Sequence, residues 1–336
     1  MEAIKSANGP NGSGALLGLR AFAPTRPGPL TRWTNDRGAI KASVRQGAPL
    51  VNSRRIGAYY SAVAPLYNAY AGDARGWHWG IWEPDVRTHQ QSLIRSNEVL
   101  VRGLDLRTGS RVLDVGCGVG GFAIWAAKTF GCRVTGITIC ADHVPLARRH
   151  ARKCGVGHLC EFLRMDMDRL SLRGARFDFV VNQESFCHSL DKRRYLSSIF
   201  DVLVPGGAWR CIDTCVAARR QSSAELRRLR NAVYEGFQIP SCPSIDAVER
   251  HLAMAGFVEV ETVDLTKHVL ANRDRMEAAG ALPFALASLF PQWCFSGTRT
   301  VRQYSGGHYR AGFAFMTALG RGYFKHVLHH ARRPVA

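Results

Sequence analysis

An apolar stretch that runs directly into a glycine-rich turn is the feature that most constrains the fold of this chain. Residues 112–121, VLDVGCGVGG, predict a buried strand, a tight turn and the start of a helix. Glycines in such a turn let the backbone approach a ligand closely. The N-terminus of the following helix favours a negatively charged group. The first expectation is therefore an α/β domain that binds a nucleotide-like ligand.

From about residue 58 the chain alternates between predicted strands and helices, which is typical of parallel βαβ units with helices on both sheet faces. The predicted strands are 111–115, 133–139, 159–164, 177–182, 208–213 and 258–265. The predicted helices are 54–70, 88–104, 121–130, 141–153, 191–204, 223–236 and 244–255. A turn at 205–207 separates a helix from the fifth strand. We therefore expect an α/β fold with a doubly wound, Rossmann-like sheet.

The length and composition of the chain allow it to form a large hydrophobic core. The chain has 336 residues, of which 46% are hydrophobic, so a core can form without disulfides or metals. It has no run of 18 strongly apolar residues, so no transmembrane segment is predicted. The ten cysteines form no CxxC pair and no zinc-like spacing with histidine. They are typical of a reducing compartment, and we expect a cytoplasmic protein.

The net charge of +19 is concentrated at the two ends of the chain. Residues 1–57 carry nine Lys or Arg against two acids, and residues 278–336 carry seven against none. Three interpretations remain open: a nucleic-acid surface, an anionic small substrate near the C-terminal region, or a solvated arginine-rich surface. No fold signature or aromatic–basic repeat supports the first, so we expect no nucleic-acid partner.

Residues 1–57 contain eight Gly and five Pro and no sustained apolar period, so they predict a disordered basic tail. Their acid-poor composition also fits an organelle-targeting segment, which is the less favoured interpretation.

Two cofactor classes compete for the glycine turn. Gly116, Gly118 and Gly121 satisfy the dinucleotide spacing, but that fingerprint requires an acid about 20 residues later. The strand 133–139 ends without an acid. Asp114 instead lies just before the turn, where a carboxylate would repel a pyrophosphate. A carboxylate suits a ligand with an ammonium and a sulfonium group, such as S-adenosylmethionine.

The order of motifs resembles a known family. Asp114-x-Gly116-x-Gly118-x-Gly120 resembles motif I of the class I S-adenosylmethionine-dependent methyltransferases. LVPGG at 203–207 resembles the turn before that family's fifth strand. The resemblance covers about residues 58–333 and implies a seven-stranded sheet. It also implies a helical lid at 58–105, a cofactor-binding core at 106–265 and a last strand at 321–333. Between the last two, at 266–320, the uncharged stretch 278–298 predicts a helical cap over a pocket, with ordinary core as the alternative.

The resemblance implies S-adenosyl-L-methionine as the cofactor. MDM at 165–167 resembles the segment whose Asp meets the adenine amino group. Many members end the second strand with an acid that holds the ribose, but GITIC at 136–140 resembles the tocopherol and fatty-acid cyclopropane-forming methyltransferases instead. Thr138 and His143 are then the ribose candidates. The predicted cofactor-binding residues are Tyr59, Asp114, Gly116, Cys117, Gly118, Gly120, Thr138, Ile139, His143, Asp166, Met167 and Gln183.

VNQESFCH at 181–188 resembles a segment of the sterol C-24 methyltransferases that places a Glu and a His where Glu184 and His188 stand. In the prenyl-diphosphate C-methyltransferases the corresponding Glu acts as a base. Methylation of an alkene carbon leaves a carbocation, which must lose a proton to a nearby base in a water-poor site. The predicted catalytic residues are Glu184, His188 as its hydrogen-bonded partner, and Tyr60. A cofactor-positioning role for Glu184 is the alternative.

The region 59–82 contains four Tyr and three Trp. Aromatic faces stabilise cations, and a plain aromatic core beneath the lid is the alternative interpretation. An acid-free C-terminal region could supply ligands for phosphate oxygens. The predicted substrate-binding residues are Trp79, Trp82, Arg299, Arg302, His308 and Arg310. No protein metal site is predicted, and a Mg²⁺ ion held through the substrate diphosphate remains open.

The sequence therefore predicts an S-adenosylmethionine-dependent C-methyltransferase acting on a prenyl diphosphate of the geranyl or farnesyl type. Glu184 would quench the carbocation, with or without cyclisation. The alternative is methylation of a small phenol, quinol, sterol or amine. A small hydrophobic isoprenoid is the expected partner, and the sequence leaves the oligomeric state open.

Overall fold

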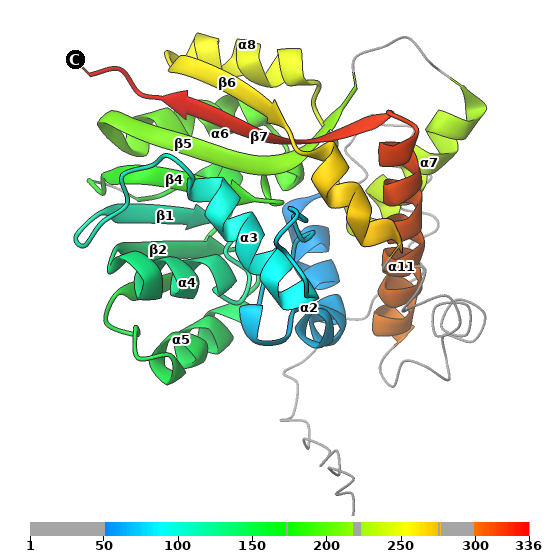
Figure 1. Ribbon diagram of the computed structural model, residues 1–336, viewed down its shortest axis with the longest axis horizontal. Helices are drawn as coiled ribbons and strands as arrows, with labels where there is room; N and C mark the ends of the chain where they lie inside the picture. The colour runs from blue at the N-terminus through cyan, green and yellow to red at the C-terminus, as the bar shows by residue number, and fades with distance from the viewer. Residues whose placement is uncertain (1–50, 173, 218–222, 275, 277–298, 336) are drawn as a thin grey trace, which may run out of the picture. The chain divides into compact units, whose positions relative to one another are not determined.

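The computed structural model describes residues 51–335 except 173, 218–222, 275 and 277–298. It contains a seven-stranded sheet in the order β3-β2-β1-β4-β5-β7-β6 (Figure 1). The strands are β1 (Arg111–Val115), β2 (Arg133–Thr138), β3 (Cys160–Arg164), β4 (Phe177–Gln183), β5 (Leu203–Val216), β6 (Val258–Asp264) and β7 (Phe324–Arg332). Strands β1 to β5 pair in parallel, and β7 runs antiparallel to both β5 and β6. The expected Rossmann-like α/β sheet is confirmed.

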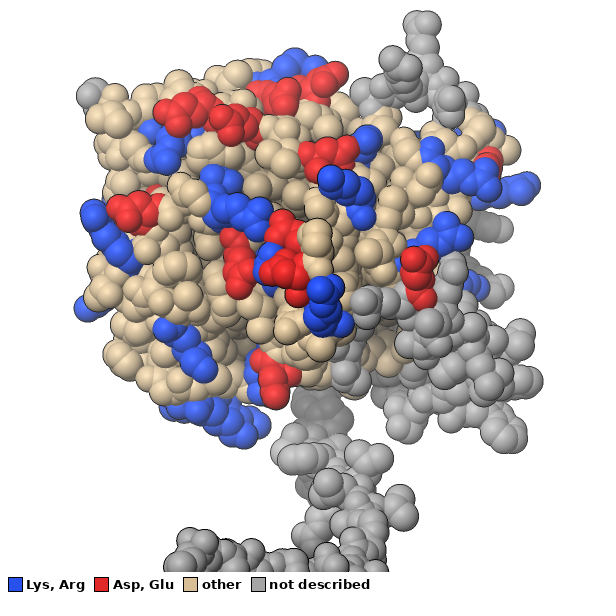
Figure 2. All heavy atoms as spheres, in the orientation of Figure 1, with Lys and Arg blue, Asp and Glu red and all other residues tan. Residues whose placement is uncertain are grey.

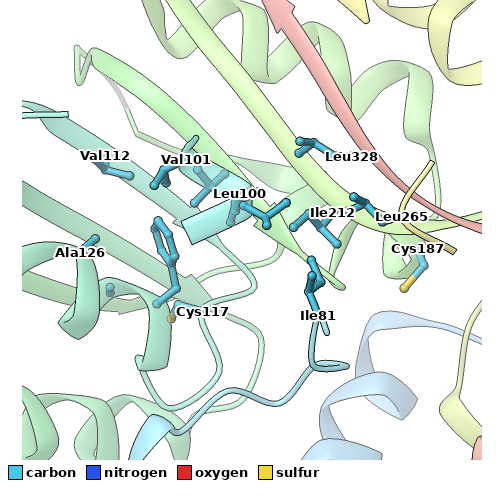
Figure 3. Packing of buried hydrophobic residues seen from close by; sticks show 14 of the residues in the cluster. Ile81, Leu100, Val101, Val112, Cys117, Ala126, Cys187, Ile212, Leu265 and Leu328 are labelled. Carbon is cyan, nitrogen blue, oxygen red and sulfur yellow. The ribbon is translucent and has the colours of Figure 1, made fainter. Parts of the chain in front are cut away.

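Helices cover both faces of this sheet. They are α2 (Ser53–Ala71), α3 (His89–Val101), α4 (Gly121–Phe130), α5 (His143–Lys153), α6 (Lys192–Val202), α7 (Ala224–Phe237), α8 (Ile245–Ala255) and α11 (Arg299–Gly320). Buried residues of α3, α4 and α5 share one apolar cluster with β1, part of which is drawn in Figure 3. Those of α6 and α8 form a second cluster on the other face. Short 3₁₀ helices lie at η1 (Gly72–Ala74), η2 (Met167–Arg169) and η3 (Phe186–His188).

The strand whose start differs most from its prediction is β5. β5 begins at Leu203 rather than 208, because the expected turn at 205–207 is absorbed as an irregularity within the strand. The register with β4 shifts between Phe177 and Phe179, and Gly206 adopts a φ of 77° there. A glycine allows this local bend without interrupting the pairing that follows.

The N-terminal lid begins earlier than its predicted start at 58. Helix α2 starts at Ser53, where the Asn52 side chain accepts a hydrogen bond from the Arg55 N–H at 3.0 Å. The rest of the predicted tail, 1–50, lies outside the described residues, as does the uncharged segment 278–298 of the predicted cap. The described part of the cap is helical at 266–274 and in α11.

The surface shown in Figure 2 mixes basic and acidic side chains. The ion pairs include those of Arg95 and Arg102 with Glu83 and of Arg95 with Asp85. None of the described helices combines the length and the apolar character that a membrane span requires.

A buried amide ties the central strands together where they end. Asn182 of β4 accepts hydrogen bonds from the Tyr195 hydroxyl at 2.6 Å and from the Trp209 indole N–H at 2.9 Å. Its own amide donates to Ser185 Oγ at 2.9 Å and to the Val115 carbonyl at 3.3 Å. The network fixes the carboxyl ends of β1 and β4, the edge at which ligands bind in open α/β sheets.

We expect the substitution Asn182→Ala to lower the free energy of unfolding by about 3 kcal/mol, because it leaves two buried donors unpaired at roughly 1–3 kcal/mol each. Urea denaturation followed by circular dichroism measures this. Tyr195→Phe is the matched control, since it removes one donor while Trp209 still satisfies the amide oxygen; its cost should be about 1 kcal/mol. Equal midpoints for Asn182→Ala and the unmodified protein would show that the network does not stabilise the sheet.

Candidate active site

Two adjoining cavities lie at the carboxyl ends of the parallel strands. The glycine-turn cavity is lined by residues of the β1–α4 turn, the end of β2, Asp166 and α2. The aromatic chamber is lined by residues of α2, α7, α11 and the ends of β4 and β5. Both are lined by Tyr60, Trp77, His78, Glu184 and His188. A ligand in one cavity therefore meets a ligand in the other at this shared wall.

The glycine-turn cavity depends on a residue without a side chain at its floor. Gly116 has a φ of 84°, and a Cβ there would lie 2.3 Å from Ser185 Cβ. The amides of Gly116 and Cys117 both donate to the Ile137 carbonyl at 2.9 Å, which anchors the turn to β2. Only glycine fits this position, because it tolerates both the conformation and the close approach.

Several buried polar atoms of this cavity have no hydrogen-bond partner among the described residues. They are Asp114 Oδ2, both ring nitrogens of His143, Gln183 Nε2 and Trp77 Nε1. Buried polar groups are normally paired, so a polar ligand is the natural partner for this set. Burial raises the pKa of the Asp114 carboxyl to about 7. An ammonium group bound beside Asp114 would restore its charged form. The set fits a ligand with ammonium and hydroxyl groups.

Helix α2 closes over this cavity through hydrogen bonds. Ser53 Oγ donates to Asp166 Oδ2 at 2.7 Å, and Ser61 Oγ donates to Asp142 Oδ1 at 2.9 Å. Asp142 also belongs, with Cys140 and His143, to the one group of described residues whose potential metal ligands lie within 4.8 Å of one another. Because Ser61 already bonds Asp142 and the Cys140 thiol donates to the Gly57 carbonyl, we assign no metal to this group.

The aromatic chamber combines stacked rings with one buried and one largely buried acid. Tyr67 stacks on Trp77 with ring centroids 4.9 Å apart, and Trp79 stacks on Phe315 at 5.5 Å. Two carboxylates, Glu184 and Asp213, line the chamber, and its described lining includes no Lys or Arg. Such a lining favours positive charge in a water-poor space.

Glu184 occupies the shared wall in a strained backbone conformation. Its φ is 51°, a left-handed value that is uncommon for residues other than glycine. Its N–H donates to the Ile212 carbonyl at 2.8 Å, and its Oε1 accepts from the Trp79 N–H at 2.7 Å. Burial and the nearby Asp213 raise the pKa of Glu184 well above its usual range. A carboxylate in this environment binds a proton readily.

His188 holds the Tyr60 hydroxyl in place. Its Nε2 lies 2.7 Å from that hydroxyl, and its Nδ1 lies 3.3 Å from the Gln238 carbonyl. A carbonyl can only accept, so Nδ1 carries the hydrogen and Nε2 accepts from Tyr60. Burial lowers the pKa of His188 to about 4, which keeps the ring neutral. This arrangement suits a partner of Tyr60 better than a base.

The structure brings most of the predicted cofactor residues together. Ten of the twelve line the glycine-turn cavity: Asp114, Gly116, Cys117, Gly118, Thr138, Ile139, His143, Asp166, Met167 and Gln183. Tyr59 lies away from it, because successive residues of a helix point in different directions. Its hydroxyl is 2.7 Å from His308 Nδ1. Gly120 also lies away from the cavity lining, packed beneath Phe162.

The predicted substrate residues are more scattered. Trp79 and His308 line the aromatic chamber. Trp82 lies outside both cavities, where its indole N–H donates to Asn272 Oδ1 at 2.9 Å. Arg310 is exposed and lines neither cavity. The side chains of Arg299 and Arg302 lie outside the described part of the chain.

Sequence reasoning missed Asp213. It accepts hydrogen bonds from the Cys187 and Thr214 backbone amides at 2.8 and 2.7 Å, so the chamber has two acids where one was expected. The available signal was an acid at the end of the predicted strand 208–213.

Comparisons with known proteins show the family to which the chain belongs. A model of a methyltransferase domain matches residues 112–207. The chain is 33% identical to an S-adenosyl-L-methionine-dependent Diels-Alderase, iccD, of Talaromyces variabilis over 200 residues, which are 57% of this chain and 67% of that protein. The chain belongs to the class I S-adenosylmethionine-dependent methyltransferases. It is a methyltransferase enzyme that uses S-adenosylmethionine.

Two further known proteins are similar to this chain over most of its length. A sterol 24-C-methyltransferase of Eremothecium gossypii is 26% identical over 251 residues, 73% of this chain and 64% of that protein. The solved structure of a geranyl diphosphate C-methyltransferase from Streptomyces coelicolor A3(2), with Mg²⁺, geranyl diphosphate and S-adenosyl-L-homocysteine, has a TM-score of 0.60 and 21% identity. That match covers 82% of this chain and 98% of the other, and it shows a shared fold.

Proposed function

We propose that this methyltransferase transfers a methyl group to an alkene carbon of an isoprenoid, and that Glu184 removes a proton from the resulting carbocation. The observation that carries the proposal is the position of Glu184: a largely buried carboxylate on the wall shared by the two cavities, in a chamber rich in aromatic rings. O- or N-methylation requires at most a base for a hydroxyl or an amine, and the aromatic surroundings would be of less use to it.

The residues divide the chemistry between them. S-adenosylmethionine, when bound in the glycine-turn cavity, supplies an electrophilic methyl on a sulfonium. The new bond joins that methyl to the alkene carbon while the carbon–sulfur bond breaks. The neighbouring carbon becomes cationic, and the rings of Tyr67, Trp77 and Trp79 stabilise it. A proton on the adjacent carbon then passes to Glu184, and its C–H electron pair closes a new double bond.

A prenyl diphosphate of the geranyl or farnesyl type is the specific substrate that we propose. The support is the acid-free C-terminal region and the name of the structural neighbour from Streptomyces coelicolor. The described lining of the chamber is acidic and aromatic, so it would repel a diphosphate. We therefore propose that the diphosphate lies near the start of α11, whose first turn carries Arg299 and Arg302 in the sequence. A Mg²⁺ ion would then be held mainly by phosphate and water oxygens.

One observation favours a second candidate. A chamber with two carboxylates and several rings also fits an amine that is already positively charged. In that case the methyl group would be transferred to nitrogen.

If the substrate is an isoprenoid, its cation could also cyclise before it loses the proton, and this additional step would take place in the same chamber.

Product analysis separates these candidates. The enzyme is incubated with methyl-labelled S-adenosylmethionine and, separately, with geranyl diphosphate, farnesyl diphosphate, a sterol, a prenylated quinol and sarcosine. We expect label on carbon in an isoprenoid product, identified by mass spectrometry and nuclear magnetic resonance. Label on oxygen or nitrogen, with none on carbon, would contradict the proposed function. Label in the sterol alone would retain the alkene chemistry and exclude the diphosphate.

A further inference from the structure

A histidine of the last strand lies directly behind Glu184. His326 of β7 is fully buried, and its Nε2 is 3.5 Å from Glu184 Oε1. In the part of the chain that the structure describes, this nitrogen has no hydrogen-bond partner of ordinary geometry. A buried ring nitrogen at this distance from a largely buried carboxylate oxygen needs only a small shift of either side chain to hydrogen-bond to it.

The other ring nitrogen determines which one carries the hydrogen. His326 Nδ1 is 3.3 Å from Thr214 Oγ1, and Thr214 is the residue opposite His326 in the pairing of β5 with β7. When the Thr214 hydroxyl donates to Nδ1, the single hydrogen of the neutral imidazole is on Nε2. That hydrogen is then on the ring nitrogen that lies 3.5 Å from Glu184 Oε1.

We propose that His326 is a positioning residue for Glu184, which it holds through an Nε2–H to Oε1 hydrogen bond with Thr214 fixing the tautomer. The Trp79 N–H donates to the same oxygen. Both contacts are made to Oε1, so Oε2 is the atom that receives the substrate proton. The catalytic part of this inference rests on the proposed function of Glu184.

Other titratable groups also face this pair. Those facing Glu184 are Asp213 of β5, Tyr60 and Tyr67 of α2, Cys187 and His188 of η3, and His78 of the loop after η1. His326 is also influenced by His78 and Asp264. Burial lowers the pKa of His78 and His188 to about 4 and that of His326 to about 3, and it raises those of the tyrosines and Cys187. Burial also raises the pKa of both acids that line the chamber, Glu184 and Asp213.

The experiment measures the protonation of Glu184 directly and needs no substrate. The infrared band of its protonated carboxyl is identified as the difference between the unmodified enzyme and Glu184→Gln, and is followed against pH. In His326→Leu we expect the midpoint to rise by about one pH unit, because the charged form has lost a donor. His326→Gln retains an N–H donor, and we expect it to restore most of the original midpoint.

His329→Leu is the matched control. His329 is equally buried on the same strand but on the opposite face, stacked against Trp209 at 6.2 Å. We expect this variant to lose stability without moving the Glu184 midpoint. If His326→Leu does not fold, Thr214→Val provides the second test, with a smaller rise expected because the tautomer is no longer fixed. An unchanged midpoint in a folded His326→Leu, or in Thr214→Val, would overturn the inference.

Turnover gives the catalytic readout. With geranyl or farnesyl diphosphate, whichever is methylated, the acidic limb of kcat in His326→Leu should move by the same amount, with KM for S-adenosylmethionine unchanged. The two proposals fail separately. Full activity of Glu184→Gln would contradict the proposed function and leave the infrared titration intact, whereas an unshifted titration contradicts the His326 contact alone.

Discussion

Glu184→Gln is expected to reduce kcat for carbon methylation by about 1000-fold or more, since a positioned base contributes roughly 10²–10⁴. Glutamine has nearly the same shape and can still accept the Trp79 N–H through its amide oxygen. It can neither accept the proton from the carbocation nor balance its charge. Single-turnover assays with labelled S-adenosylmethionine measure the chemical step without interference from product release.

The controls for Glu184→Gln separate binding from chemistry. Calorimetry measures how much of the S-adenosylmethionine affinity the variant retains, which matters because Glu184 also lines the glycine-turn cavity. Glu184→Asp retains the acid but withdraws it by one methylene, so we expect an intermediate loss of about 10–100-fold from the misplaced base. Activity of Glu184→Gln within tenfold of the unmodified enzyme would contradict the carbocation mechanism and favour transfer to oxygen or nitrogen.

Asp114→Asn is expected to weaken S-adenosylmethionine binding by about 100-fold, since a buried, charge-assisted pair with the ammonium group contributes roughly 1.5–3 kcal/mol. Asp114 is buried at the end of β1, and its Oδ2 has no partner among the described residues. Isothermal calorimetry with S-adenosylmethionine measures the loss. S-adenosylhomocysteine, which retains the ammonium group and lacks the sulfonium charge, should lose affinity to a similar extent.

The same residue predicts how the affinity depends on pH. The pKa of Asp114 is about 7 in the free protein, so below pH 7 a cationic ligand binds only after the carboxyl has released its proton. The affinity for S-adenosylmethionine should therefore fall about tenfold for each pH unit below 7 and level off above it. Asp114→Asn removes the titrating group, so its affinity should be nearly independent of pH in this range. An equally steep dependence in that variant would assign the effect to another residue.

The parts of the fold that the sequence predicted best are those whose start and end are marked by residues close by in the sequence. The bounds of β1 and α4 match their predictions, because an apolar run, a glycine turn and Gly131 just beyond the helix end mark them within one short segment. The start of β5 could not be predicted in this way. Its Pro-Gly-Gly segment has the composition of a turn, and only pairing with β4 and the C-terminal strand makes it part of a strand.

In the candidate active site, too, some residues could be predicted from the local sequence and others only from the tertiary structure. The motif residues around Gly116 and Glu184 could be found because they follow directly on strands. Which of Tyr59 and Tyr60 faces the cavity depends on the rotation of α2 over the core, which a run of adjacent aromatics does not specify. His326 is 142 positions from Glu184 in the sequence and reaches it only because β7 inserts antiparallel beside β5. No local sequence pattern could therefore predict that His326 lies beside Glu184.

The hydrogen bonds of α2 have a consequence for the order of events in a catalytic cycle. The helix is attached to the rim of the donor site through Ser53 and Asp166, and to the acceptor site through Tyr60 and His188. Helix α2 therefore borders both the glycine-turn cavity and the aromatic chamber. Displacing it to release the spent donor also uncovers the acceptor, so a reactive intermediate is protected from water only while both ligands are in place.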